Sequence, residues 1–320
     1  MRVHVWGAAG YAASEAIRLV TVHPELSLGV LESRSHAGED IAAAFPTLRR
    51  IERQFEPAGS VLAAVRSGDI VIAAGVEGEA LELAPELLRR GARVVDLSAD
   101  HRFEEAAAYG LTEWNAHEIA RAALVANPGC YPTAALLALL PLATFDEPLE
   151  IIIDAKSGIT GAGRSPKTGS LFAEVSGEIR AYGLKGHRHL PEIEARLRAA
   201  GIGAPVTFTP HVVPLARGML VDAYVVFREA LDAGDLRAAY ARAYDDAPFV
   251  RILDGMAPSV AGVAGTNDAE MCVSVHGRVV RVICAIDNLG KGAAGQAIAN
   301  INLMCGFPEE LGFHDRVVVA

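Results

Sequence analysis

A cysteine, Cys130, stands where a strand-like apolar run (124–126) gives way to a helical pattern that begins near Thr133. The intervening Pro-Gly pair favours extended backbone before Pro128 and a sharp turn at Gly129. A thiol at the start of a helix feels the positive end of the helix dipole, which lowers its pKa and favours the nucleophilic thiolate. A lone cysteine is more often a buried structural residue, so a nucleophile requires a partner base.

Two histidines flank an arginine, His187 and His189, just before a helix that Pro191 is expected to start. A thiol nucleophile needs a base and a group that orients the base, and His189 with Glu192 fits that pairing best. Two histidines and an acid could also bind a metal. No third ligand of convincing spacing follows, so no metal site is predicted.

The elements that could position this chemistry begin with a dinucleotide-binding pattern. A strand (3–6) runs into Gly7-Ala8-Ala9-Gly10-Tyr11-Ala12, and a helix continues to about His23. Glycines let the backbone approach a pyrophosphate, and the helix start offers unpaired N–H groups. The spacing G-x-x-G-x-x-A is less specific than G-x-G-x-x-G, so a tight turn in an unrelated α/β protein stays open.

A second strand (26–32) is followed by Ser33-Arg34-Ser35. An acidic residue here would hold the ribose 2′-hydroxyl of NAD, and Glu32 could do so. A guanidinium between two hydroxyls suits a 2′-phosphate better, which favours NADP over NAD. A solvated loop arginine is the alternative.

Further strands (69–74 and 93–97) and a helix (81–90) alternate along the chain. This alternation predicts a Rossmann-type, doubly wound parallel sheet. Gly75 and Ser98 follow the ends of these strands, where ligands bind in open α/β sheets. The polar segment 98–102 lies at the same kind of position.

The second half has a different pattern. A strand (149–155) leads into the glycine- and hydroxyl-rich loop 157–165, which could cradle an anionic group or act as a mobile linker. Strands at 206–213, 220–227, 271–275 and 279–285 are joined by short turns. They predict a second α/β domain with a mixed, largely antiparallel sheet. The expected domains are 1–145, completed by a C-terminal helix in 290–320, and 146–289.

Composition excludes several classes of protein. The net charge of −10 and the pI near 5.5 argue against nucleic-acid and anionic-membrane partners. The longest apolar run, 134–143, contains Pro141 and is too short to span a bilayer. Four cysteines without a C-x-x-C pair suggest a reducing compartment, and the chain opens on a strand with no signal peptide. We therefore expect a cytoplasmic protein.

Taken together, these stretches resemble the N-acetyl-gamma-glutamyl-phosphate reductase family of arginine biosynthesis over nearly the whole chain. The cysteine and double-histidine motifs are highly specific, whereas the glycine motif is not. The resemblance rests on Gly7-Ala8-Ala9-Gly10-Tyr11, Leu97-Ser98-Ala99-Asp100, Asn127-Pro128-Gly129-Cys130-Tyr131-Pro132-Thr133, Ser157-Gly158, Gly161-Ala162-Gly163-Arg164, His187-Arg188-His189-Leu190-Pro191-Glu192, Gly265-Thr266-Asn267, Ala285-Ile286-Asp287-Asn288-Leu289 and Lys291-Gly292.

The resemblance implies NADPH-dependent reduction of N-acetyl-L-glutamyl 5-phosphate to the 5-semialdehyde, with release of phosphate, through a thioester on Cys130. It also implies a homodimer or homotetramer. Cys130, His189 and Glu192 would be catalytic. The expected cofactor-binding residues are Gly7, Ala9, Gly10, Tyr11, Ala12, Ser33, Arg34, Ser35, Gly75, Ser98, Gly161, Asn288 and Lys291. The expected substrate-binding residues are Asn127, Arg102, Ser157, Arg164, His187 and Arg217.

Other functions fit parts of the same pattern. A reductase acting on aspartyl phosphate, or on a carrier-linked aminoadipyl phosphate, would keep the fold but should differ around the cysteine. A thiol hydrolase would use Cys130 and His189 without a dinucleotide, and a nucleotide sensor would bind NADPH without turnover. His101 stands where many members of the family carry Phe, which leaves its role open.

Overall fold

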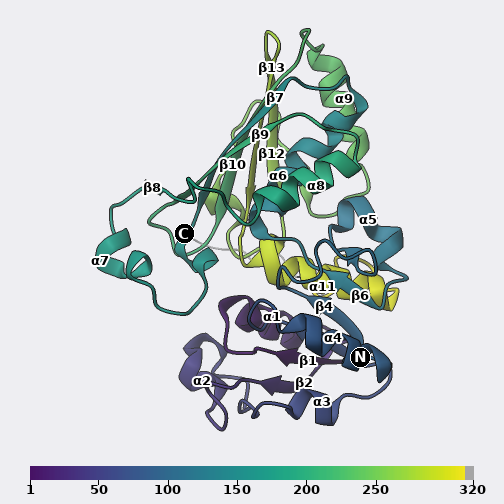
Figure 1. Ribbon diagram of the computed structural model, residues 1–320, viewed down its shortest axis with the longest axis vertical. Coiled ribbons are helices and arrows are strands. Elements are labelled where there is room, and N and C mark those ends of the chain that lie inside the picture. Colours follow the sequence, from purple (N-terminus) through teal and green to yellow (C-terminus); the bar gives the residue numbers. More distant parts are fainter. Residues whose placement is uncertain (314–320) are drawn as a thin grey trace. The chain divides into compact units, whose positions relative to one another are not determined.

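The computed structural model describes residues 1–313 and divides them into two compact units. Of the described residues, the first unit holds 1–129 and 293–313, and the second holds 130–292. Each unit is built around its own sheet (Figure 1).

The sheet of the first unit is parallel throughout, with six strands among the described residues in the order β2-β1-β3-β4-β6-β5. Its central strands are apolar and buried, as expected when helices cover both faces. The order reverses direction between β1 and β3, which makes their carboxyl ends the switch point. The strands are β1 (Arg2–Trp6), β2 (Ser27–Glu32), β3 (Ile70–Ala73), β4 (Arg93–Asp96), β5 (Ala108–Tyr109) and β6 (Leu124–Ala126).

Helices build a separate apolar core on each face of this sheet. One core includes residues of α1 and α11, and the other includes residues of α3 and α4. The helix α11 packs against α1 and α5, so the chain returns to the first unit after completing the second. The helices are α1 (Tyr11–Val22), α2 (Ile41–Ala44), α3 (Ser60–Ala64), α4 (Ala80–Arg89), α5 (Thr112–Ile119) and α11 (Gly295–Cys305).

The second unit contains a mixed sheet of seven described strands in the order β11-β12-β13-β10-β7-β9-β8. Pairs β7/β9 and β11/β12 are parallel, and the other neighbours are antiparallel. The strands are β7 (Glu150–Ser157), β8 (Arg180–Ala181), β9 (Val206–Val212), β10 (Met219–Val226), β11 (Val250–Ile252), β12 (Ala269–His276) and β13 (Val279–Ile286).

Three helices cover one face of this second sheet. Figure 1 shows α6, α8 and α9 on the same side of the strands. Side chains along β7 alternate accordingly, with Ile151 and Ile153 buried and Ile152 exposed between them. The helices are α6 (Cys130–Leu139), α7 (Phe172–Val175), α8 (Leu190–Ala199), α9 (Ala233–Ala243) and α10 (Val260–Val263).

The predicted fold class, a Rossmann-type parallel sheet with a second, mixed α/β domain, is confirmed. The helix after the Pro-Gly turn differs from expectation. It starts at Cys130 itself rather than near Thr133, and it belongs to the second unit rather than to residues 1–145. The physical reason is that residues 131–139 are buried on every side, because α6 packs against β10 and β13.

Candidate active site

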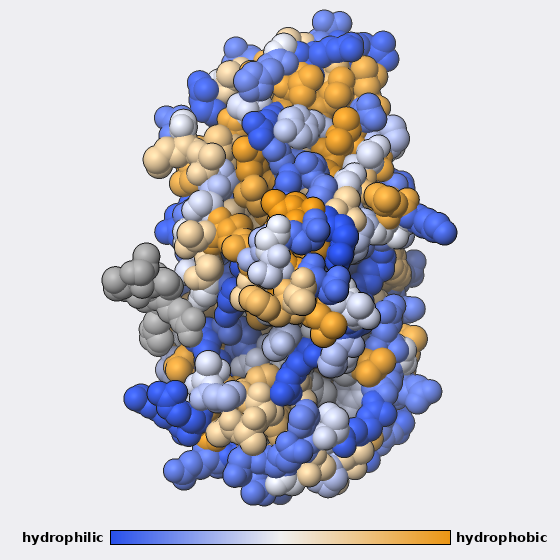
Figure 2. Space-filling view, turned by 90° about the vertical axis from the view of Figure 1, so that its left-hand side faces the viewer, coloured by the Kyte–Doolittle hydropathy of each residue, from blue (hydrophilic) through white to orange (hydrophobic). Residues whose placement is uncertain are grey.

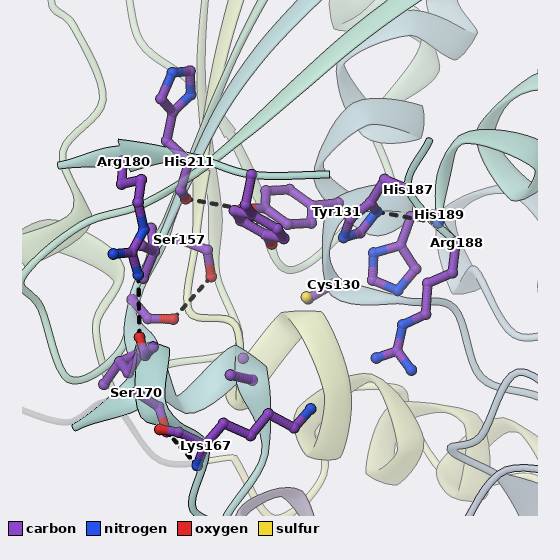
Figure 3. A pocket seen from close by; sticks show the side chains of 17 residues that line it. Cys130, Tyr131, Ser157, Lys167, Ser170, Arg180, His187, Arg188, His189 and His211 are labelled. Atoms are coloured by element: carbon purple, nitrogen blue, oxygen red, sulfur yellow. Dashed lines mark hydrogen bonds between the residues drawn. The ribbon is translucent and has the colours of Figure 1, made fainter. Parts of the chain in front are cut away.

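Cys130 lines a pocket of about 560 Å³ in the second unit (Figure 3). As the first residue of α6, it stands at the helix start that the sequence predicted for a reactive thiol. Gly292 approaches it closely. A Cβ on Gly292 would lie 2.8 Å from the Cβ of Cys130, so a larger residue there would displace the thiol.

Both predicted histidines line the same pocket. In Figure 3 the rings of His187 and His189 lie on the same side of the pocket as the sulfur of Cys130. His189 is buried and precedes α8 as its N-cap residue, while His187 is half-buried two residues earlier. The fold thus gathers a thiol and two imidazoles that are far apart in the chain.

The ring of Tyr131 contacts both histidines. Tyr131, directly after the cysteine, packs its ring edge-on against His187 and His189, with centroid distances of 5.6 Å and 5.9 Å. Its hydroxyl donates to the His211 carbonyl at 3.2 Å and lies 3.3 Å from the Tyr182 hydroxyl. Burial raises the pKa of Tyr131, which keeps the hydroxyl protonated.

Glu192 lies in the first turn of α8, three residues after His189, and is buried. A carboxylate in the first turn of a helix interacts favourably with the helix dipole. Its position is compatible with the orienting role predicted from the sequence.

Three cations also line the pocket among the described residues, and sequence reasoning missed them. They are Lys167, Arg180 and Arg188, and no aspartate or glutamate of the described chain accompanies them. Figure 3 shows the Lys167 and Arg188 side chains extending into the pocket. A signal existed, because the stretch 164–188 is rich in basic residues. Cationic walls of this kind suit an anionic ligand.

The residues predicted to bind substrate are dispersed. Ser157 lines the pocket, and its hydroxyl donates to the Gly158 carbonyl at 3.1 Å. Arg164 is half-buried in the same unit but does not line the pocket. The Nε of Arg217 lies 2.6 Å from a carboxylate oxygen of Asp287, which is fully buried. That ion pair fixes Arg217 within the second unit.

Two more of these predicted residues belong to the first unit, where they stabilise its own turns. Arg102 donates from Nε to the Asn127 carbonyl at 3.0 Å and from Nη2 to the Leu97 carbonyl at 3.2 Å. The Asn127 amide donates to the Ala293 carbonyl at 3.1 Å and accepts from Asn300 at 3.0 Å. Both side chains are nearly fully buried.

The predicted glycine turn has the geometry that a dinucleotide-binding turn requires. Gly7 adopts φ +77°, and a Cβ there would lie 2.5 Å from the Ala74 carbonyl oxygen. The turn therefore packs tightly on the end of β3, beside Gly75, at the switch point of the sheet. Gly10 precedes α1 as its N-cap residue, and Ala9, Tyr11 and Ala12 complete the turn and helix start.

The residues after β2 favour a phosphate over a ribose hydroxyl. Both carboxylate oxygens of Glu32 cap the start of α3, accepting from the backbone N–H groups of Gly59 at 3.0 Å and Val61 at 2.8 Å. Ser33 and Ser35 lie with their hydroxyls 3.5 Å apart, and the exposed Arg34 between them pairs with Glu79. Ser98 after β4 donates its hydroxyl to Asp96 at 2.9 Å.

The other predicted cofactor residues belong to the second unit. Asn288 accepts from the Gly218 N–H at 2.6 Å and donates to the Thr160 hydroxyl at 3.0 Å. Gly161 lines the pocket, and Lys291 is fully buried with its Nζ 5.2 Å from the Phe249 ring centroid. Asn288 thus ties the loop after β7 to the turn before α11.

Two kinds of feature are absent from residues 1–313. No helix there is both long and apolar enough to cross a membrane. The same residues contain no group of three or more histidine, cysteine, aspartate or glutamate side chains placed to hold a metal ion. All four cysteines lie in this range, and none of them forms a disulfide.

A Rossmann-type parallel sheet followed by a second unit with a mixed sheet is the fold of the semialdehyde dehydrogenases. Two family models match accordingly, the semialdehyde dehydrogenase NAD binding domain over residues 2–122 and the dimerisation domain over residues 130–288. Solved structures of similar fold include aspartate semialdehyde dehydrogenase II complexed with ASA from Vibrio cholerae, with a TM-score of 0.74 at 17% identity over 95% of this chain and 98% of that one. Another is aspartate semialdehyde dehydrogenase with NADP from Candida albicans, with a TM-score of 0.73 at 15% identity over 95% of this chain and 99% of that one. At these identities the likeness shows the fold alone.

More similar relatives narrow the class. The N-acetyl-gamma-glutamyl-phosphate reductase of Geobacter sp. (strain M21) is 42% identical over 341 aligned residues, covering 98% of this chain and 97% of that protein. The protein of the same name from Moorella thermoacetica is 40% identical, with 97% of each chain covered. The chain belongs to the N-acetyl-gamma-glutamyl-phosphate reductase family.

Proposed function

We propose that this protein reduces N-acetyl-L-glutamyl 5-phosphate to N-acetyl-L-glutamate 5-semialdehyde with NADPH, releasing phosphate, in arginine biosynthesis. The observation that carries the proposal is that Cys130 and His189 line one pocket whose charged walls are Lys167, Arg180 and Arg188. A thiol, a proton carrier and cationic walls are the groups that an anionic acyl phosphate requires. The family relationship supports the same substrate.

In this mechanism the Cys130 thiolate attacks the acyl carbon, and the carbon–oxygen bond to phosphate breaks with its electron pair leaving on phosphate. Backbone N–H groups at the start of α6 stabilise the tetrahedral oxyanion, because they carry the positive end of the helix dipole. The resulting thioester holds the acyl group on the enzyme. A thioester carbon accepts hydride far more readily than a carboxylate does.

His189 handles the proton. It protonates the oxygen of the thiohemiacetal as negative charge develops there, and takes the proton back when the carbon–sulfur bond breaks to release the aldehyde. Glu192, buried in the first turn of the helix that follows, orients the imidazole. Ser157 and the three cations hold the phosphate and carboxylate of the substrate. Arg217 supports this site indirectly, because its ion pair with Asp287 holds it within the same unit.

The residues of the first unit fit NADP. The left-handed Gly7 turn and the start of α1 suit a pyrophosphate, and Ser33, Arg34 and Ser35 suit a 2′-phosphate. The carboxylate of Glu32 accepts hydrogen bonds from the start of α3, so it is not available to bind the ribose hydroxyls of NAD. When bound, NADPH supplies the hydride for the thioester. If Arg34 paired with the 2′-phosphate in place of Glu79, the protein would bind NADPH more tightly than NADH.

We also propose that two or four copies assemble through the uncovered face of the second sheet, in the cytoplasm. This face carries Ile152, Tyr224 and Ile283 beside an Asp222–Arg281 ion pair. Figure 2 views the side of this unit that α6, α8 and α9 leave open, and hydrophobic residues gather in its upper part. The matched dimerisation-domain model supports assembly through this unit. Ile152→Arg should lower the mass measured by light scattering if this face is the interface.

The test of the activity is phosphate- and arsenate-dependent NADP reduction with N-acetyl-glutamate semialdehyde, compared with aspartate semialdehyde. We expect turnover with the former and little with the latter. Cys130→Ser should abolish turnover while NADPH binding persists. Near-normal turnover in that variant would refute the thioester mechanism, and a preference for aspartate semialdehyde would refute the substrate.

A further inference from the structure

We propose that His187 is a positioning residue, which fixes the acid–base histidine by accepting the backbone N–H of His189 on its own ring nitrogen. The inference rests on the proposed function for the role of His189. Its starting observation is the 3.2 Å hydrogen bond from the His189 backbone N–H to Nδ1 of His187.

This bond closes a turn at the head of α8. The Leu190 N–H donates to the His187 carbonyl at 3.0 Å, and the Ile193 N–H donates to the His189 carbonyl at 3.0 Å. The ring and the carbonyl of His187 thus receive two successive N–H groups. Together they set the direction in which His189 leaves the backbone, in the way that a capping side chain does.

The bond also fixes the protonation of His187. A ring nitrogen that accepts a hydrogen bond must carry a lone pair, so the proton of the neutral imidazole sits on Nε2. The positive form would present N–H at both nitrogens and lose the bond. Burial, and the nearby charge of Arg188, lower the pKa of His187 and favour the same neutral form.

Aromatic packing holds the His187 ring in place. Its centroid lies 5.6 Å from that of Tyr131, 5.4 Å from Tyr182 and 5.4 Å from Phe208, with interplanar angles of 65–90°. The His189 ring lies 4.9 Å away. Edge-to-face contacts of this kind restrict rotation of the ring, so Nδ1 stays directed at the His189 N–H.

These constraints give the two histidines different roles. Accepting a proton on Nδ1 would break the turn at His189, and giving up the Nε2 proton would leave an imidazolate. His187 therefore serves catalysis through the placement of His189, and proton transfer falls to His189.

The experiment compares three substitutions of His187 in the full-length enzyme. In His187→Asn the side-chain oxygen takes nearly the place of Nδ1, whereas His187→Gln moves the acceptor outward and His187→Ala removes it. We expect the Ala and Gln variants to lose about 10²-fold in kcat with little change in KM, since small displacements at a reacting centre have effects of that order. The Asn variant should recover most of the loss. A proton-transfer role predicts losses of about 10²–10⁴-fold in all three variants alike.

Equal loss in all three variants, or no loss in any, would overturn the proposal. A second measurement does not depend on turnover or on a variant's folding. In ¹⁵N-histidine-labelled wild-type enzyme at pH 7.5, the His187 ring should show an unprotonated Nδ1 and a protonated Nε2. A protonated Nδ1 would overturn the proposal, whereas failure of the wild-type enzyme to reduce the acyl phosphate would refute only the proposed function.

Discussion

Gly7 is expected to be the most sensitive position of the nucleotide-binding turn. Its φ of +77° lies in the left-handed region, and an added Cβ would lie 2.5 Å from the Ala74 oxygen and 2.6 Å from the Gly75 nitrogen. Both obstacles are backbone atoms, so no side chain can rotate aside. Left-handed backbone costs a residue with a Cβ about 1–2 kcal/mol. Forcing atoms into packed space costs about 1–3 kcal/mol more.

Gly7→Ala should therefore lower the free energy of unfolding of the first unit by roughly 2–5 kcal/mol. Gly10→Ala is the matched control in the same turn. Gly10 has φ −83°, and beyond its own chain neighbours its added Cβ would meet the Gly7 oxygen at 3.9 Å, an ordinary van der Waals distance. Its cost should stay below about 1 kcal/mol, the loss from a poorer N-cap residue.

Urea unfolding followed by tryptophan fluorescence measures this difference. Both tryptophans of the chain, Trp6 in β1 and Trp114 in α5, lie in the first unit, so the signal reports that unit. NADPH titration of the same variants should show weaker binding for Gly10→Ala at nearly unchanged stability, because its methyl group occupies space left for a ligand. Equal unfolding midpoints for the two variants would refute the strain argument.

Three further outcomes are expected. Arg180→Gln should raise KM for the acyl phosphate about 10–100-fold with kcat nearly unchanged, because one charge-assisted hydrogen bond to the substrate is lost. Arg198 is an exposed arginine of α8 outside the pocket, so an equal effect of Arg198→Gln would contradict this prediction. Arg34→Ala should weaken NADPH binding more than NADH binding in parallel titrations, and equal losses would remove the 2′-phosphate role. The hydrogen bond to Asp96 raises the pKa of His101, so its stabilisation is complete below the unfolded-state pKa near 6.5 and is lost as pH rises through the higher native value. His101→Phe should thus destabilise the protein more at pH 5.5 than at pH 9 in thermal melts, and a gap that widens with pH would contradict this sign.

Much of the fold followed from local patterns. The turn from β1 to α1 combines a buried strand, glycines and an amphipathic helix within one short stretch, so neighbouring residues decide it. The alternation of apolar side chains along β7 and β10 likewise reflects a sheet covered on one face. The unit to which α6 belongs was harder to predict from the sequence. A segment that is apolar on every side has no periodicity to show which unit buries it.

The candidate site was less accessible from sequence. Arg217 and Asn127 have side chains suited to a substrate, yet their hydrogen bonds and ion pairs lie within the protein, and only the folded chain reveals partners so distant in sequence. Arg180 shows the opposite case. It lies on a two-residue strand in an irregular region, with no motif around it, and enters the pocket because β8 pairs with β9. In both cases, contacts between residues far apart in the sequence determine where the side chain lies, and the neighbouring sequence does not reveal them.

Charge distribution reconciles the acidic chain with an anionic substrate. The net charge of −10 gives the protein a negative long-range field, which repels nucleic acids and other polyanions. Screening confines those long-range effects to roughly 8 Å at physiological salt. The charged side chains that line the pocket in the described part of the chain are instead Lys167, Arg180 and Arg188, so a small anion that has entered meets a positive environment. Among the described residues that line the pocket with Cys130 there is no carboxylate, and a negative neighbour would disfavour the thiolate that the chemistry needs.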